Sequence, residues 1–271
     1  MTGILSGVTA VSLAVTAMPT PHRSLASLIT CAWLVCAAST ASALAASAPA
    51  GDVYVDPVNG SDTTGNGGAL SPWKTLKHAI QQPAVSKIHL APGVCSPASG
   101  ESFPLYLPRI EGSGPGISII DGGGADVVFH AWTTTNASPR LSRLTLRNAV
   151  CAVDAESAVT NPAAVTLQDV DIEQCSASGV RVSANFSNVS LALERCVLRN
   201  SRIGVELGSA DFSSSGAYVA SLSANDCTFE LCSIGVQSST RDQHPGAQAR
   251  ADLWRCDVRA CDTGVALLQA V

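Results

Sequence analysis

The feature that most constrains this chain is an internal repeat that begins near Leu141 and continues toward the C-terminus. A small residue followed by valine recurs five times, and the intervals between successive copies are 27, 25, 31 and 29 residues. The five copies, here called anchors, are Ala152-Val153, Gly179-Val180, Gly204-Val205, Gly235-Val236 and Gly264-Val265. Intervals of this length are typical of a solenoid, in which each repeat is one coil that stacks on its neighbours.

Apolar residues recur at fixed distances before the anchors. Eleven positions before them, or twelve in the second coil, which has one inserted residue, stand Leu141, Leu167, Leu193, Ala224 and Leu253. The short alternations in between predict strands of two to four residues separated by tight corners. Stacked coils whose strands pair in parallel about 4.8 Å apart could bury this apolar side, which a single coil could not. We therefore predict an all-β fold, a right-handed single-stranded parallel β-helix, in which the anchor glycines occupy corners that need positive φ or a close backbone approach.

Charged residues in outward positions give an independent test of this alignment. Nine positions before the anchor, or ten in the second coil, which has one inserted residue, the series reads Arg143, Asp169, Arg195, Asp226 and Arg255. Five positions before it, or six in the second coil, the series reads Arg147, Glu173, Arg199, Glu230 and Arg259. Both series alternate in sign from coil to coil. In-register stacking places opposite charges next to each other, where they attract. The alternation therefore predicts the register, and it predicts that these acids are ionised and paired.

Several cysteines fall into the same columns. Cys227 and Cys256 share one inward column, and Cys232 and Cys261 share another. One interpretation is a row of buried thiols that pack as small apolar groups. The other is a set of disulfides between adjacent coils, because the stacking distance lies within the Cα separation that a disulfide allows. Both interpretations stay open for these four residues.

The first part of the chain differs from the rest. Residues 1–46 hold one charged residue, Arg23, followed by an apolar run and an Ala-Ser-Ala triplet at residues 41–43. This pattern predicts a secretory signal peptide, whose translation could also start at Met18. A lipoprotein anchor at Cys31 or Cys36 is the weaker alternative. We expect a secreted or cell-surface location, in which disulfides are allowed.

Residues 47–137 are predicted to form an N-terminal cap and the first coils, and residues 138–271 the regular coils. Within the cap, Ser71-Pro72 predicts the start of a short helix in which Trp73, Leu76 and Ile80 share one face. Such a helix would cover the open end of the first coil. The sequence stops inside a coil without a recognisable C-terminal cap, and this predicts end-to-end self-association through that coil.

The cap region also resembles a known family. The segments that carry the resemblance are Tyr54-Val55, Gly60-Ser61-Asp62, Pro72-Trp73-Lys74-Thr75-Leu76, Leu90-Ala91-Pro92-Gly93, Gly100-Glu101-Ser102-Phe103-Pro104 and Ile120-Asp121-Gly122. In this order they are similar to the domain of unknown function 1565, a family of the pectate-lyase-like right-handed β-helix superfamily. The resemblance implies an exported or cell-surface bacterial protein with a pectin-lyase-like fold. It implies no activity, since the family has no agreed catalytic residues.

The acids offer little for catalysis. Asp154 and Glu156 lie two positions apart and could share a face, but Arg181 and Glu206 stand at the position of Asp154 in the next two coils. A Ca²⁺ site of clustered acids, which polysaccharide lyases of the superfamily use, finds no support, and neither the cysteines nor the histidines have the spacing of a metal site. No catalytic residue and no cofactor are assigned. A formal net charge of −5 does not indicate nucleic-acid binding.

Two tryptophans are candidates for sugar binding. Trp254 occupies an outward column otherwise filled by polar residues, and Trp132 is the second candidate. We interpret the chain as an exported β-helix protein of cell-surface or adhesive type that binds a polysaccharide or cell-surface glycan. The alternative is a polysaccharide lyase or glycoside hydrolase that acts on an extracellular polysaccharide.

Overall fold

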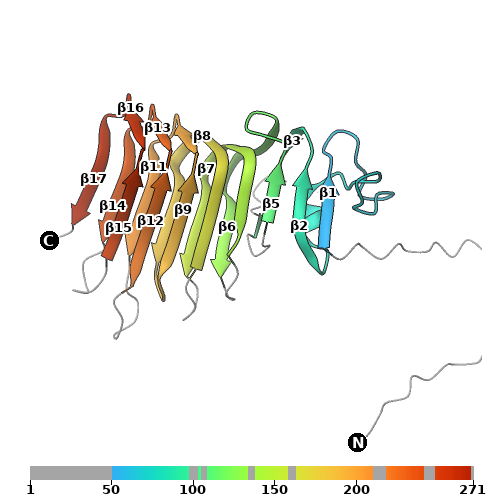
Figure 1. Ribbon diagram of the computed structural model, residues 1–271, viewed down its shortest axis with the longest axis horizontal. Coiled ribbons are helices and arrows are strands. Elements are labelled where there is room, and N and C mark those ends of the chain that lie inside the picture. Colours follow the sequence, from blue (N-terminus) through green and yellow to red (C-terminus); the bar gives the residue numbers. More distant parts are fainter. Residues whose placement is uncertain are drawn as a thin grey trace, which may run out of the picture. The chain divides into compact units, whose positions relative to one another are not determined.

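The protein is described from a computed structural model, which covers residues 51–97, 103–104, 109–133, 138–157, 163–209, 218–240 and 248–269. The fold is an all-β parallel solenoid. Each coil contributes up to three strands, and each strand pairs in parallel with the equivalent strand of the next coil (Figure 1). The predicted signal peptide, with Met18, Cys31 and Cys36, lies outside the described residues. Right-handed coiling stays a prediction, in keeping with the usual hand of parallel crossover connections.

The strands form three faces, here called the first, second and third. The first face contains β1 (Gly51–Val55), β2 (Val85–Leu90), β5 (Arg109–Gly112), the starts of β7 (Arg140–Ser157) and β8 (Ala163–Ala184), β9 (Val189–Glu194), β12 (Val219–Asn225) and β15 (Gln248–Trp254). The second contains β3 (Gly93–Cys95), the start of β6 (Ser118–Thr133), the middle parts of β7 and β8, β10 (Val197–Arg199), β13 (Thr228–Glu230) and β16 (Asp257–Arg259). The third contains β4 (Phe103–Pro104), the ends of β6, β7 and β8, β11 (Ile203–Ser209), β14 (Ile234–Thr240) and β17 (Thr263–Gln269).

The strands are longer than the sequence pattern predicted. Strands of three residues occur on the second face, for example in β10, but β9 has six residues and β11 has seven. In β7 and β8 the pairing even continues through the corners, so that a single strand extends over all three faces. The prediction of two to four residues was wrong there, because the inward alternation marks only the part of a strand that faces the core.

In the coils from Arg143 onward, the corners are formed by residues other than glycine. Left-handed backbone with φ between 52° and 59° recurs at two places in each coil. The corner between the first and second faces holds Arg143, Asp169, Arg195, Asp226 and Arg255. The corner between the second and third faces holds Asn148, Gln174, Asn200, Leu231 and Ala260. One of the two charged series therefore lies along a corner, where its side chains leave the sheet.

The anchor glycines have a different role from the one expected at positive φ. None of Gly179, Gly204 and Gly235 has positive φ. Instead, a Cβ atom at these positions would lie 2.7, 2.4 and 2.6 Å from the carbonyl oxygen of the glycine in the following coil. The backbones of successive coils thus approach closely along this column, so of the two roles predicted for the anchor glycines the close backbone approach is the correct one.

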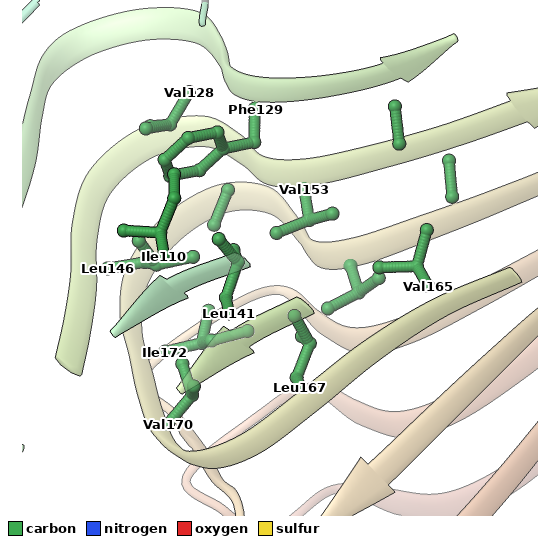
Figure 2. Packing of buried hydrophobic residues seen from close by; sticks show 14 of the residues in the cluster. Ile110, Val128, Phe129, Leu141, Leu146, Val153, Val165, Leu167, Val170 and Ile172 are labelled. Atoms are coloured by element: carbon green, nitrogen blue, oxygen red, sulfur yellow. The ribbon is translucent and has the colours of Figure 1, made fainter. Parts of the chain in front are cut away.

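The core consists of apolar columns that run through the stack. Figure 2 shows one of them, in which Ile110, Leu141 and Leu167 lie one above another, as the strand register also requires. All three side chains are essentially inaccessible to solvent. Burial of each leucine or isoleucine contributes about 1.5–3 kcal/mol, so the stacking of coils is the main source of stability. In the last described coil, Leu253 and Val258 are only partly buried.

A short helix packs against the first coil. Helix α2 (Leu76–Ile80) follows Thr75, whose hydroxyl accepts a hydrogen bond from the backbone N–H of His78. The prediction that Ser71-Pro72 begins the helix was wrong, because Trp73 pairs as an extended residue with Val55 and keeps this segment out of the helix. The predicted apolar face of the helix is confirmed for Leu76 and Ile80, which are buried in the core cluster, whereas Trp73 is buried there from outside the helix. The N-terminal capping helix is therefore present but starts later.

Candidate functional site

Both charged series form the ion pairs that the sequence predicted, with one further acid at the start of each. On the corner, the guanidinium nitrogens of Arg195 and Arg255 lie 2.7 and 2.6 Å from carboxylate oxygens of Asp169 and Asp226. On the second face, Arg199 lies 3.0 Å from Glu173. The remaining pairs are Arg143 with Glu111, Arg147 with Asp121, and Arg259 with Glu230. The hydrogen bond from Arg195 lowers the pKa of Asp169, and an acid held ionised in this way is a poor general acid.

The outward side of the first face carries a continuous row of polar and aromatic side chains. We call it the long row; it consists of Tyr54, His89, Glu111, Ser142, Gln168, Glu194, Asn225 and Trp254. The register places each of these residues directly beside the next. Trp254, at one end, has 65% of its surface exposed, as its column predicted. Tyr54 is half-exposed at the other end and stacks on His89 with 4.8 Å between ring centroids.

Two adjoining hollows lie along the N-terminal half of this row, and together we call them the first-face groove. The larger has a volume of about 420 Å³ and is lined by Tyr54 and His89, among others. The smaller has a volume of about 230 Å³ and is lined by Lys87, Arg109, Arg140, Ser142, Gln168 and Asp169. Glu111 and Arg143 line both hollows. The groove is open and is about the size that one or two sugar units would need.

The acids in the groove are ionised. Glu111 lies 2.5 Å from the Lys87 ammonium and 3.3 Å from the Arg143 guanidinium, and the hydrogen bond from Lys87 lowers its pKa. Asp52, beside the groove, accepts a hydrogen bond from His89 Nε2 at 3.1 Å, which lowers the pKa of Asp52. Neither carboxyl is suited to donate a proton at neutral pH. This arrangement can hold a ligand but offers no general acid.

A second cluster of charged residues lies on the third face. Asp154 stacks between His130 and Arg181, and Arg181 stacks against Glu206. The Arg181 guanidinium lies 3.5 Å from Asp154 and 3.4 Å from Glu206, while His130 Nε2 lies 3.6 Å from Glu156. The expectation that Asp154 and Glu156 share a face is confirmed. His130 was missed, because only the strand register brings it beside them.

Within this third-face cluster, Asp154 is the unusual acid. Its side chain is 14% exposed, and burial raises its pKa, although the charges of Arg181 and His130 oppose the increase. Asp154 and Glu206 are two coils apart, or about 9.6 Å, close to the separation of the two acids in inverting glycosidases. Arg181, however, lies between the two carboxylates and bonds to both, where the attacking water would have to stand. The cluster therefore has about the separation of a catalytic pair, but it lacks the space for an attacking water.

The family model described as protein of unknown function (DUF1565) matches residues 58–243. The chain belongs to this family. The DUF1565 match includes His89, Glu111 and Arg143 of the first-face groove and the whole third-face cluster. It excludes Tyr54 and Trp254, the two aromatic ends of the long row. Neither a curated protein nor a solved structure matched the chain.

The two tryptophan candidates of this DUF1565 member lie on different faces. Trp132 pairs through its backbone with Glu156 on the third face, while Trp254 ends the first face. The side chain of Trp132 lies outside the described residues. The structure therefore does not unite the two tryptophans in one site. Tyr54 is the aromatic residue that shares the row of Trp254, and the alternation Val53-Tyr54-Val55 could have indicated its outward position.

The cysteines stack as their columns predicted. The Cys196 backbone N–H donates a hydrogen bond to Cys227 Sγ at 3.5 Å. A hydrogen bond between the two thiols, together with burial, raises the pKa of Cys196. Cys256 follows in the same column, and the thiols of Cys232 and Cys261 also interact. These cysteines are all free thiols in the structure, without disulfides between them. Disulfides for Cys227, Cys256, Cys232 and Cys261 stay a prediction.

Metal ligands and membrane-spanning helices concern the part of the chain that the structure describes. Among those residues, no group of three or more His, Cys, Asp or Glu side chains is arranged to hold a metal ion. The helix found there is also too short to cross a membrane. The two candidate sites of this DUF1565 member are the first-face groove and the third-face cluster.

Proposed function

We propose that this DUF1565 protein is an exported β-solenoid of cell-surface or adhesive type that binds a glycan along its first face. The observation that carries the proposal is the long row, in which polar side chains form a continuous line between two exposed aromatic residues, Tyr54 and Trp254. Polar groups can bond to sugar hydroxyls, and aromatic rings can pack against the apolar side of a sugar ring. A long polysaccharide could contact several coils at once.

Glycan-array binding of the purified chain tests this proposal. Tyr54→Ala and Trp254→Ala should each weaken binding without changing the thermal unfolding temperature, because both side chains project outward. Phe186→Ala is the matched control, since Phe186 is also exposed (40%) but is absent from the long row. If no glycan binds, or if the control weakens binding as much as Trp254→Ala, the proposal fails.

Export is a separate part of the proposal. It rests on the charge-poor, apolar character of residues 1–46, and on the abundance of cysteines in the coils. Cell fractionation with an antibody to the coils, followed by N-terminal sequencing, tests it. A protein that stays in the cytoplasm with an intact N-terminus would contradict export.

An enzyme is the second candidate function, and the burial of Asp154 favours it. In that case Asp154 would donate a proton from the third-face cluster to an extracellular polysaccharide, as in a glycoside hydrolase. A lyase is the other form of this alternative. New reducing ends, or unsaturated products that absorb ultraviolet light, would support an enzyme if Asp154→Asn abolished them. Glycan binding without any product would leave the adhesive function as the better explanation.

Self-association is proposed for the last described coil. Leu253 and Val258 lie in inward columns but are only partly buried there, and Val265 is 48% exposed. A second copy of the chain could cover these side chains by stacking end to end. Light scattering across a range of concentrations tests this, and a monomer throughout that range would contradict it.

A further inference from the structure

Three cations stack in register beside the long row. Lys87 pairs with Arg109, and Arg109 pairs with Arg140 in the next strand of the first face. Parallel strands place such neighbours about 4.8 Å apart, where like charges repel. Elsewhere in the solenoid the charged series alternate in sign. This cation column, as we call Lys87, Arg109 and Arg140, breaks that rule.

The acids nearby neutralise the column only in part, since Glu111 pairs with Lys87 and the charge of Asp169 is also felt by Arg140. Glu111 is shared between Lys87 and Arg143, and Asp169 is bound by Arg195. Arg140 donates a hydrogen bond to the neutral side chain of Gln168. Arg109 is exposed, and no carboxylate of the described residues lies within ion-pair distance of it or of Arg140. Two arginines with free hydrogen-bond donors therefore remain at the edge of the groove.

The local charge differs in sign from that of the whole chain. Four cations and two acids line the smaller hollow, which gives a local charge of +2, whereas the chain has a net charge of −5. A positive hollow on an acidic protein concentrates anions at that place. Arginine in particular binds carboxylates through two parallel hydrogen bonds. A ligand with carboxylates would thus compensate the repulsion within the column.

We propose that the first-face groove binds an acidic polysaccharide, with its carboxylates on Arg109 and Arg140 and its sugar rings along Tyr54 and the long row. This inference rests on the proposed glycan-binding function and names the ligand class. A polyuronate is linear and carries a carboxylate on each sugar unit, which matches a linear column of cations next to a row of polar side chains. Nucleic acid fits less well, because the positive charge is confined to a short stretch of an acidic protein.

Titration calorimetry with oligogalacturonate, a neutral glucan of the same length and single-stranded DNA tests this inference. Arg109→Gln should weaken oligogalacturonate binding about tenfold, as expected for loss of a hydrogen bond to a charged group. The affinity should also fall as salt concentration rises. Because Arg109 has no ion pair and its removal relieves repulsion within the column, this variant should unfold at or slightly above the temperature of the unmodified protein.

The matched control is Arg250→Gln, which removes an arginine from the far end of the same face, where Arg250 pairs with Asp252 at 2.8 Å. It should leave oligogalacturonate binding unchanged. Equal losses in Arg109→Gln and Arg250→Gln would overturn the assignment to the cation column. Preference for the neutral glucan or for DNA would overturn the ligand class. Binding of the neutral glucan alone would leave the proposed function standing, whereas absence of any glycan binding would overturn both.

Discussion

Arg199 Nε lies 3.0 Å from Glu173 Oε2 in the coil before it, while Glu230, in the coil after it, pairs with Arg259 at 3.1 Å. The corner series has the same arrangement, since Arg195 bonds to Asp169 and Asp226 bonds to Arg255. In each pair the arginine reaches the acid of the preceding coil. Each charged column is therefore a series of separate ion pairs. Along it, a bonded step, at which the charges of two adjacent coils form an ion pair, alternates with a longer-range step, at which they lie further apart.

A double-mutant cycle can measure this alternation. We expect a coupling of about 0.2–1 kcal/mol between Glu173 and Arg199, the range of exposed ion pairs, and a smaller one between Arg199 and Glu230. Glutamine variants measured by urea unfolding give both values. Equal coupling energies for the two steps would contradict the pairing described here. High salt should reduce the larger coupling.

The glycine column predicts a large difference between two identical substitutions. In Gly204→Ala the new Cβ would lie 2.4 Å from the Gly235 carbonyl oxygen, which is backbone and cannot move away easily. We expect a loss of about 1–3 kcal/mol in the free energy of unfolding. In Gly264→Ala the nearest atom is Val258 Cγ1 at 3.5 Å, an ordinary contact. Urea denaturation should find the second variant close to the unmodified protein, and similar losses in both would contradict the model of close approach.

Leu231 offers a stabilising substitution. It is 56% exposed and has φ of 54°, a conformation that asparagine tolerates better than leucine does. Asn148 and Asn200 occupy the same corner in other coils. Leu231→Asn should therefore raise the free energy of unfolding by about 0.5–1 kcal/mol. Leu231→Val is the control and should lower it, since a β-branched residue suits this conformation least. Thermal unfolding of the three proteins should follow that order.

Two acids should give stability opposite dependences on pH. The hydrogen bond from Arg195 lowers the pKa of Asp169, so its contribution is present above the unfolded pKa of about 3.9 and is lost as pH falls below that value. Burial raises the pKa of Asp154, so its protonated form is favoured in the fold, and stability falls as pH rises through the folded pKa. The measurement is the unfolding temperature of the unmodified protein minus that of each variant, between pH 3 and 7. This difference should increase with pH for Asp169→Asn and decrease with pH for Asp154→Asn.

The thiol count tests the disulfide prediction. Eight cysteines lie in the described coils, so one Cys232–Cys261 bridge would leave six reactive thiols in the denatured, unreduced mature protein. Reduction should restore eight. In Cys232→Ser, Cys261 should react without reduction. Eight reactive thiols before reduction would exclude the bridge.

The sequence was sufficient to predict the stacked coils, because the repeated residues determine which positions of adjacent coils lie side by side. Arg147 and Glu173 were predicted to lie side by side in adjacent coils, and the strand register confirms this. The corners were harder, since αL backbone at Arg195 or Leu231 has no residue signature and is imposed by the stacking of neighbouring coils. The helix start failed for a similar reason, because the pairing of Trp73 with Val55 overrides the local preference of Ser71-Pro72.

The candidate sites were less predictable than the fold. Trp254 followed from its column, but Tyr54, His89 and Arg109 lie in the irregular early coils, where no anchor spacing aligns them with later ones. His130 meets Asp154 only through the pairing of β6 with β7. Sites built from neighbouring coils depend on alignment, and the sequence determines alignment only where the repeat is regular.

The alternation of bonded and longer-range steps has a consequence for how such a chain can change its length. Removing one coil would bring Arg147 beside Arg199, and Arg143 beside Arg195, so that like charges would meet in both columns. Removing two coils would bring Arg147 beside Glu230 and restore the order of signs. The unit that can be duplicated or deleted without cost to the charge pattern is therefore a pair of coils, although the backbone repeats with every single one.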